Sequence, residues 1–185
     1  MSANHAAFNL IFRFVENYVS PIAGRISSQR HVMAIRDGFI SAMPFMIVGS
    51  FLLVFAYPPF SPDTTWGFAR AWLDMAKQFE GQILTPFDMT MEVMSLYICA
   101  AIAYNLGKHY VKTHQLDPFM CAMLSLMAFL LVAAPKTKGA LPVDSLGGTG
   151  IFTAILVAIY CVEMMRFLKA HNIGIRLPDQ VPPMI

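Results

Sequence analysis

Charged residues are scarce in this sequence. Asp, Glu, Lys and Arg make up 13% of its 185 residues, about half the share of a typical soluble domain, whereas hydrophobic residues make up 57%. The basic residues stand in short clusters beside apolar segments and form no extended stripe, so the formal net charge of +2 does not indicate nucleic-acid binding. This balance argues against an ordinary water-soluble domain and favours an integral membrane protein.

The sequence also lacks the common catalytic and metal-binding motifs. It has no GxSxG, P-loop, GxGxxG or HExxH pattern, and the Gly-Gly-Thr-Gly stretch at 147–150 is not followed by the Lys-Ser/Thr pair of a phosphate-binding loop. Arg13 and Glu16 interrupt the apolar N-terminus, so no cleavable signal peptide is predicted. We therefore expect no catalytic residue, no metal site and no cofactor.

The sequence contains few cysteines, and their spacing matches no common cysteine motif. Three cysteines form no CxxC pair, and each lies inside an apolar segment, as is typical of small buried side chains: Cys99, Cys121 and Cys161.

Long apolar runs are what the sequence does contain. From Gly38 to Pro62, 25 residues carry no ionisable group except the Tyr57 phenol, and such a helix is longer than the roughly 30 Å hydrocarbon core of a bilayer. Pro44 lies inside this run and is expected to kink the helix. The pattern predicts an all-α polytopic membrane protein with about four transmembrane helices, at about 36–57, 89–109, 118–135 and 150–167.

Two amphipathic segments accompany the predicted spans. Residues 4–20 and 65–84 each place apolar side chains at helical spacing opposite polar ones. Charges interrupt both segments too often for a span, so we expect interfacial helices lying along the membrane surface. For 65–84, packing as a cap on other helices is an open alternative. The chain divides into 1–29, an N-terminal amphipathic helix with its connection, and 30–185, a membrane domain.

The distribution of Lys and Arg predicts the orientation. With a cytoplasmic N-terminus, nine of these residues fall on the cytoplasmic side and four on the other, namely Arg70, Lys77, Lys136 and Lys138. The positive-inside rule therefore favours a multi-pass protein with a cytoplasmic N-terminus and C-terminus.

Few polar residues are candidates for function. Glu92 is the only acid of the second predicted span, and it lies near the end of that span. It is either an interfacial carboxylate or a functional group, because a charge deeper in the bilayer is costly. His109 and His114 lie in or beside a short basic loop without a nearby cysteine or acid pair, so no metal site is predicted there.

Two motifs carry a family resemblance. The sequence Arg-His-x-x-Ala-Ile-Arg-Asp-Gly-Phe-Ile-x-x-Met-Pro-x-x-Ile-x-Gly-Ser at 30–50 resembles the opening of the membrane-embedded IIC component (EIIC) of the bacterial sugar phosphotransferase system (PTS). The similarity is to its lactose/cellobiose (diacetylchitobiose) branch, EIIC type 3. The sequence Leu-Pro-Asp-Gln-Val-Pro-Pro at 177–183 resembles the motif that this family places before its fifth span.

The resemblance implies a permease of the bacterial cell (inner) membrane. It implies uptake of a cellobiose/lactose-type disaccharide coupled to phosphorylation of the sugar, with PTS IIB and IIA components as partners, a homodimer and contacts with membrane lipid. The family holds its sugar mainly through a C-terminal half that this sequence does not match. The substrate-binding residues are therefore unknown here, and so is the particular sugar.

Two functional hypotheses follow, and a third is weaker. The chain is a truncated N-terminal fragment of such a permease, not competent alone, or it is a stand-alone membrane scaffold that dimerises or pairs with a separate C-terminal half. A small four-helix ion-conducting or substrate-binding protein is the third, and it depends on Glu92 alone.

Overall fold

The computed structural model describes residues 16–17, 20–134 and 142–173. Within these ranges the chain forms helices and connecting loops with no strand, which confirms the all-α fold class. The predicted helix at 4–20 lies almost entirely outside the described residues, and the motif at 177–183 lies completely outside them. The main helices in chain order are α2 (Ser20–Ser27), α3 (Arg30–Ala56), α4 (Gly67–Phe87), α5 (Met94–His114), α6 (Pro118–Ala133) and α7 (Ile151–Ala170).

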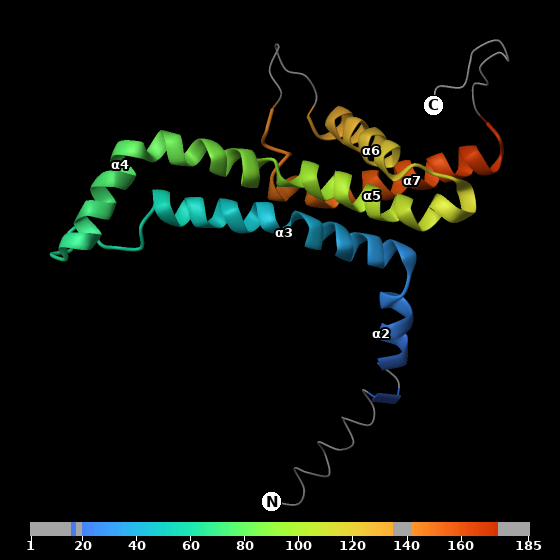
Figure 1. Ribbon diagram of the computed structural model, residues 1–185, viewed down its shortest axis with the longest axis horizontal. Helices are drawn as coiled ribbons and strands as arrows, with labels where there is room; N and C mark the ends of the chain where they lie inside the picture. Colours follow the sequence, from blue (N-terminus) through green and yellow to red (C-terminus); the bar gives the residue numbers. More distant parts are fainter. Residues whose placement is uncertain (1–15, 18–19, 135–141, 174–185) are drawn as a thin grey trace, which may run out of the picture.

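Helix α5 is the centre of a bundle in which it packs against α3, α6 and α7 (Figure 1). Its buried residues recur at helical spacing and include large side chains: Ser95, Ile98, Cys99, Ile102, Ala103, Leu106, Gly107 and Tyr110. This spacing covers a wide face of the helix, because residues three and four apart stack on one side. The hydrophobic core of the described residues is therefore built around α5.

Helix α3 lies antiparallel to α5 and contacts it through small residues. A Cβ atom on Gly38 would come within 2.9 Å of the Ile102 backbone nitrogen, so only glycine fits at this closest approach. Small residues let helix backbones approach in the same way at helix contacts in membranes. The helix continues through Pro44 without interruption. Its buried residues are Ala34, Gly38, Ala42, Gly49 and Ala56.

The amphipathic segment and the second predicted span belong to one helical run. Helix α4 leads through a π-helix, η2 (Asp88–Glu92), into α5. Val93, with φ −115° and ψ 18°, lies between η2 and α5. The contacts of α4 with the end of α3 include a hydrogen bond from Trp72 Nε1 to the Phe55 carbonyl oxygen at 3.2 Å. These contacts agree with the packing alternative for 65–84, and a place along the membrane surface stays a prediction.

Among the described residues, three helical segments are long and apolar enough to cross a membrane: Arg30–Ala56, Gly67–His114 and Gly148–Ala170. The third includes a short 3-10 helix, η3 (Gly148–Gly150), before α7. Helix α6 is also apolar, but its 16 residues extend only about 24 Å. These helices overlap the four predicted spans, and four membrane crossings stay a prediction.

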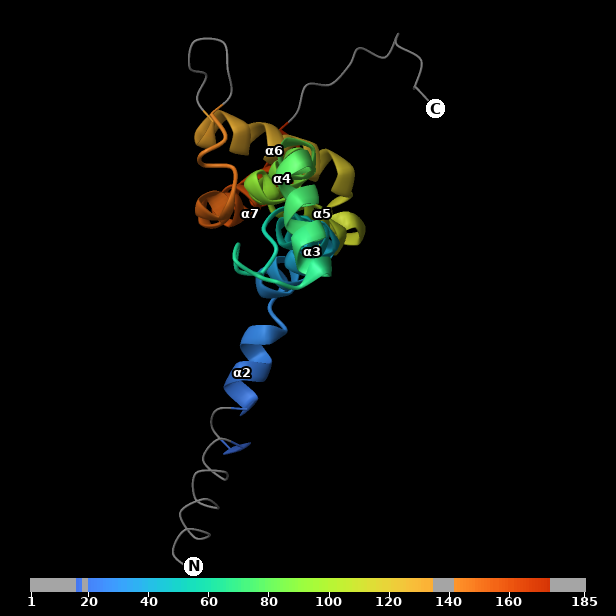
Figure 2. The ribbon, with the colours of Figure 1, turned by 90° about the vertical axis from the view of Figure 1, so that its left-hand side faces the viewer.

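Helix α2 projects from the bundle at the point where α3 begins (Figure 2). The turn at Ser28 and Gln29 joins the two helices, and the Ser28 amide donates to the Gly24 carbonyl oxygen at 3.1 Å. The start of α3 therefore lies at a corner of the molecule, next to the ends of α5 and α7.

Candidate functional site

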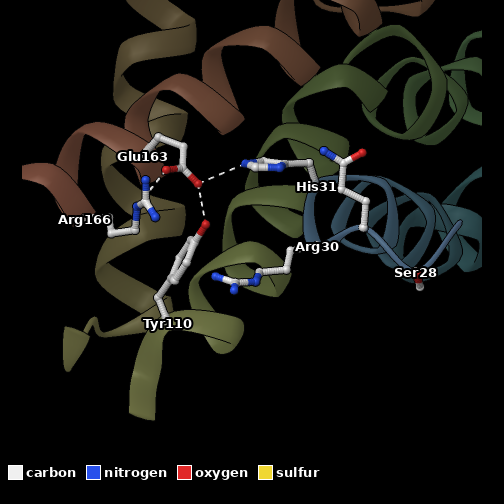
Figure 3. A pocket seen from close by; sticks show the side chains of 7 residues that line it. Ser28, Arg30, His31, Tyr110, Glu163 and Arg166 are labelled. Carbon is white, nitrogen blue, oxygen red and sulfur yellow. Dashed lines mark hydrogen bonds and ion pairs between the residues drawn. The ribbon is translucent and has the colours of Figure 1, made fainter. Parts of the chain in front are cut away.

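A carboxylate on α7 connects three helices at the end of the bundle where α3 begins (Figure 3). The Tyr110 hydroxyl of α5 donates to Glu163 Oε1 at 2.5 Å, and His31 Nε2 of α3 lies 2.9 Å from the same oxygen. Glu163 Oε2 lies 2.8 Å from Nε of Arg166, three residues further along α7. One acid thus contacts α3, α5 and its own helix, and we call Arg30, His31, Tyr110, Glu163 and Arg166 the Glu163 cluster.

Two guanidinium groups flank the aromatic ring of the cluster. The Cζ atoms of Arg166 and Arg30 lie 5.2 Å and 5.7 Å from the centroid of the Tyr110 ring, within the range of cation–π attraction. Tyr110 is 1% exposed, whereas the side chains of Glu163 and Arg166 are 24% and 39% exposed. The cluster is therefore anchored in the core and partly open to its surroundings.

The cluster lines a pocket of about 320 Å³ together with Ser28 and Gln29. Arg30 and Arg166 contribute two positive charges and Glu163 one negative charge, so the pocket carries a net charge of one positive unit when His31 is neutral. Among the described residues Arg30 makes no ion pair. The pocket can therefore accept an anion without further compensation.

The structure places Glu92 at the other end of α5. It is exposed, at the last position of η2, and lines a separate pocket of about 370 Å³ together with Asp144 and Thr149. His109 is exposed, and the His114 ring packs edge-on against Tyr110 at a centroid distance of 5.8 Å. These residues do not converge on one site. Within the described ranges, no three His, Cys, Asp or Glu side chains are grouped as metal ligands.

The three cysteines are buried, which confirms the expectation from their apolar surroundings. Cys99 and Cys121 are 0% exposed and Cys161 is 7% exposed, and all three are free thiols.

Glu163 was not among the residues predicted from the sequence. It is the only acid between Asp144 and Asp179, so the criterion that selected Glu92, a lone acid in an apolar span, applies equally to it. Its partners His31 and Tyr110 are 132 and 53 residues away in the chain. No sequence pattern connects positions so far apart, because only the packing of the helices brings them together.

The fold and this site describe a helical membrane bundle with a cluster of charged and polar side chains at the end where α3 begins. The family described as "Phosphotransferase system, EIIC" matches residues 36–185. The chain therefore belongs to the PTS EIIC family, which confirms the resemblance carried by the motif at 30–50.

Curated relatives agree with this family. The chain is 35% identical to the PTS cellobiose-specific EIIC component of Geobacillus stearothermophilus, over 94% of this chain and 40% of that protein. It is 34% identical to the lichenan permease IIC component of Bacillus subtilis (strain 168), over 96% of this chain and 40% of that protein.

A solved structure is similar as well. The crystal structure of ChbC, the IIC component from the N,N'-diacetylchitobiose-specific phosphotransferase system, superposes with a TM-score of 0.74 at 34% identity. The superposition covers 92% of this chain and 40% of ChbC. The chain thus spans about 40% of the length of these relatives.

Proposed function

We propose that this chain supplies membrane helices of a PTS sugar permease that takes up a cellobiose/lactose-type sugar coupled to its phosphorylation. The observation that carries the proposal is the family match over residues 36–185, and the similarity to ChbC over 92% of the chain supports it. In this proposal PTS IIB and IIA components are the partners, because phosphorylation of the sugar requires a phosphoryl donor.

Within the permease, the described residues act as a scaffold. Glu163 connects α3, α5 and α7, and the buried face of α5 holds these helices together. We assign sugar recognition to the part of the relatives that this chain does not cover, and we expect residues 1–185 alone not to transport.

Chimeric proteins test this proposal. In a bacterial strain without a cellobiose EIIC component, one plasmid encodes residues 1–185, and a second joins these residues to the remaining part of the Geobacillus cellobiose-specific component. We expect phosphotransferase-dependent cellobiose uptake from the chimera only. Uptake by residues 1–185 alone would contradict the scaffold role. A chimera that inserts into the membrane at normal levels but does not transport would contradict the proposed permease.

The proposal places the start of α3 on the cytoplasmic side and makes the chain multi-pass. The excess of Lys and Arg at this end supports that orientation. Labelling of introduced cysteines with a membrane-impermeant maleimide tests it, because the three native cysteines are buried. Ser61→Cys should react in intact cells and Ser28→Cys only after permeabilisation, since both serines are exposed and belong to opposite ends of α3. The reverse pattern would overturn the orientation.

A second candidate function has support from the surface of α3. Large apolar side chains along this helix are exposed: Ile40, Met43, Phe45, Ile47, Val48, Phe51 and Val54. Lipid can cover such a surface, and so can a second copy or a separate C-terminal half, as a stand-alone scaffold would require. Cross-linking of a Phe51→Cys variant in native membranes separates these cases, because a homodimer gives a species of twice the mass, a separate C-terminal half gives a species of another mass, and lipid contact gives none.

A further inference from the structure

We propose that the pocket lined by the Glu163 cluster binds a phosphate ester. The pocket lies between the start of α3 and the last turns of α5 and α7, and no ligand is assigned to it by the sugar permease function proposed above. The proposal does not depend on sugar transport, because it concerns residues to which no sugar contact is assigned and is tested without sugar.

The pocket has an excess of positive charge. Arg30 and Arg166 together exceed Glu163 by one positive charge, and a phosphate ester is an anion, with one negative charge as a diester and up to two as a monoester, so the pocket attracts it. The excess is not quenched by a neighbouring acid, since Arg30 makes no ion pair within the described residues.

The guanidinium groups of Arg30 and Arg166 both lie at the pocket. Arg166 contacts Glu163 through Nε at 2.8 Å, and its side chain also lines the pocket. Arg30 and Arg166 approach the same Tyr110 ring, which brings two forked donors to one pocket (Figure 3). Guanidinium forks match the spacing of phosphate oxygens and bind them with two parallel hydrogen bonds.

The backbone at the start of α3 adds donors on the same side. The first amide groups of a helix have no intrahelical acceptor, and Gln29, the N-cap of α3, provides no side-chain capping bond. Gln29 also lines the pocket, so these amides border the space where an anion would lie.

The ligand could be a lipid headgroup or a water-soluble phosphate ester, and both present the same chemistry. Basic pockets between membrane helices at the cytoplasmic side bind anionic lipid headgroups. Exposed apolar side chains close in sequence to the pocket residues, Ile26, Met164 and Phe167, offer surface for acyl chains. A soluble phosphate ester would not use that surface.

Binding to the purified 185-residue chain in detergent micelles tests the proposal. Native mass spectrometry measures the bound fraction of phosphatidylglycerol and of zwitterionic phosphatidylcholine, and a parallel titration uses glycerol 1-phosphate as the soluble probe. We expect phosphatidylglycerol to be preferred over phosphatidylcholine, and Arg30→Gln to weaken its binding about tenfold, as for the loss of one charge-assisted hydrogen bond. If glycerol 1-phosphate binds and phosphatidylglycerol is not preferred over phosphatidylcholine, the pocket is a phosphate-ester site and its ligand is a water-soluble ester. Binding of neither anion would overturn the proposal.

Arg36→Gln is the matched control. It removes the same charge from the same helix, and both arginines are exposed, but Arg36 pairs with Asp37 at 2.8 Å and does not line the pocket. This variant should change phosphatidylglycerol binding less than about twofold, because an exposed ion pair contributes little. Equal effects of Arg30→Gln and Arg36→Gln would show attraction by general surface charge and would overturn the site.

A variant that is expected to strengthen phosphatidylglycerol binding distinguishes a role in ligand binding from a role in structural support. Glu163→Gln removes the negative charge and keeps a carbonyl oxygen that can accept the Tyr110 hydrogen bond, so phosphatidylglycerol should bind more tightly. Weaker binding by a Glu163→Gln protein with wild-type helical content, measured by circular dichroism, would contradict the proposal. If this variant does not fold, the comparison of Arg30→Gln with Arg36→Gln decides the question.

Discussion

Helices α3 and α5 lie side by side but bury different kinds of residue. The 27 residues of α3 bury five, all of them Gly or Ala, and many of its large side chains are exposed, as in Phe51 at 62% and Ile47 at 54%. The 21 residues of α5 bury eight, among which Ile98, Ile102, Leu106 and Tyr110 are large. The helix with the longer charge-free run therefore contributes less side-chain volume to the core.

This difference reflects the solvent. In water a large apolar side chain is driven inward, but lipid solvates it as well as a protein core does, so van der Waals packing selects which residues meet. Small residues on α3 bring its backbone close to α5, and the large side chains of α5 fill the space between α3, α6 and α7. The apolar length of a segment thus indicates a membrane helix, while the positions of Gly and Ala indicate the face that packs.

The largest expected effect is at the closest approach of the two helices. Gly38→Leu should destabilise the bundle by about 3 kcal/mol, the upper range for overpacking, because a Cβ atom there would meet the Ile102 backbone nitrogen at 2.9 Å. Thermal unfolding in detergent, followed by circular dichroism, measures the change. Gly81→Leu in α4 is the control, since nothing lies within 4 Å of its Cβ position. Equal unfolding temperatures for both variants would refute the tight contact.

A matched pair of truncations tests the difference between filled and exposed faces. Ile102→Ala in α5 should cost about 2 kcal/mol or more, because Ile102 is 0% exposed and a cavity would remain. Phe51→Ala on α3 should change the free energy of unfolding by less than about 0.5 kcal/mol. A comparable loss for Phe51→Ala would mean that another protein surface, and not lipid, covers this part of α3.

The Glu163 cluster makes a smaller contribution to the contact between α3 and α5. Tyr110→Phe removes one hydroxyl that donates to Glu163 at 2.5 Å, and His31 and Arg166 stay in place, so we expect a loss of about 1 kcal/mol. Tyr104→Phe on the same helix is the control, because Tyr104 is 40% exposed. Denaturant titration of both variants would contradict the proposed role of the cluster if the two midpoints shifted equally.

The smallest expected effect is at Glu92. Because this side chain is exposed at the end of η2, Glu92→Gln should change stability by less than about 0.5 kcal/mol. Unchanged ion conductance of vesicles containing the variant would remove the remaining support for an ion-conducting protein. A marked change in conductance would instead place a functional carboxylate next to the second pocket.

Helix positions were predictable from the sequence to different degrees. The predicted span 118–135 agrees closely with α6, which ends at Ala133, because Asp117 caps its start: the Phe119 amide donates to Asp117 Oδ1 at 2.9 Å. The span at 89–109 differs more, since α5 covers Met94–His114. A π-helix at Asp88–Glu92 precedes it, and apolar spacing does not reveal where the backbone changes from i→i−4 to i→i−5 hydrogen bonds.

The candidate site was less predictable than the helices. Glu92 is a candidate because it is the lone acid of an apolar span, and Glu163 satisfies the same criterion. The sequence does not reveal which of the two acids has hydrogen-bond and ion-pair partners on other helices. His31, Tyr110 and Arg166 stand near the ends of three separate helices. Their convergence depends on the order and direction in which these helices pack.

The sequence by itself determined the all-helical class, the membrane character and the family, because these depend on local apolar length and on a contiguous motif at 30–50. Only the tertiary structure decided that α5 is the central helix and that Glu163 joins residues 132 and 53 positions away. The physical reason is that apolar length acts within one helix, whereas side-chain contacts between helices depend on close packing at small residues such as Gly38.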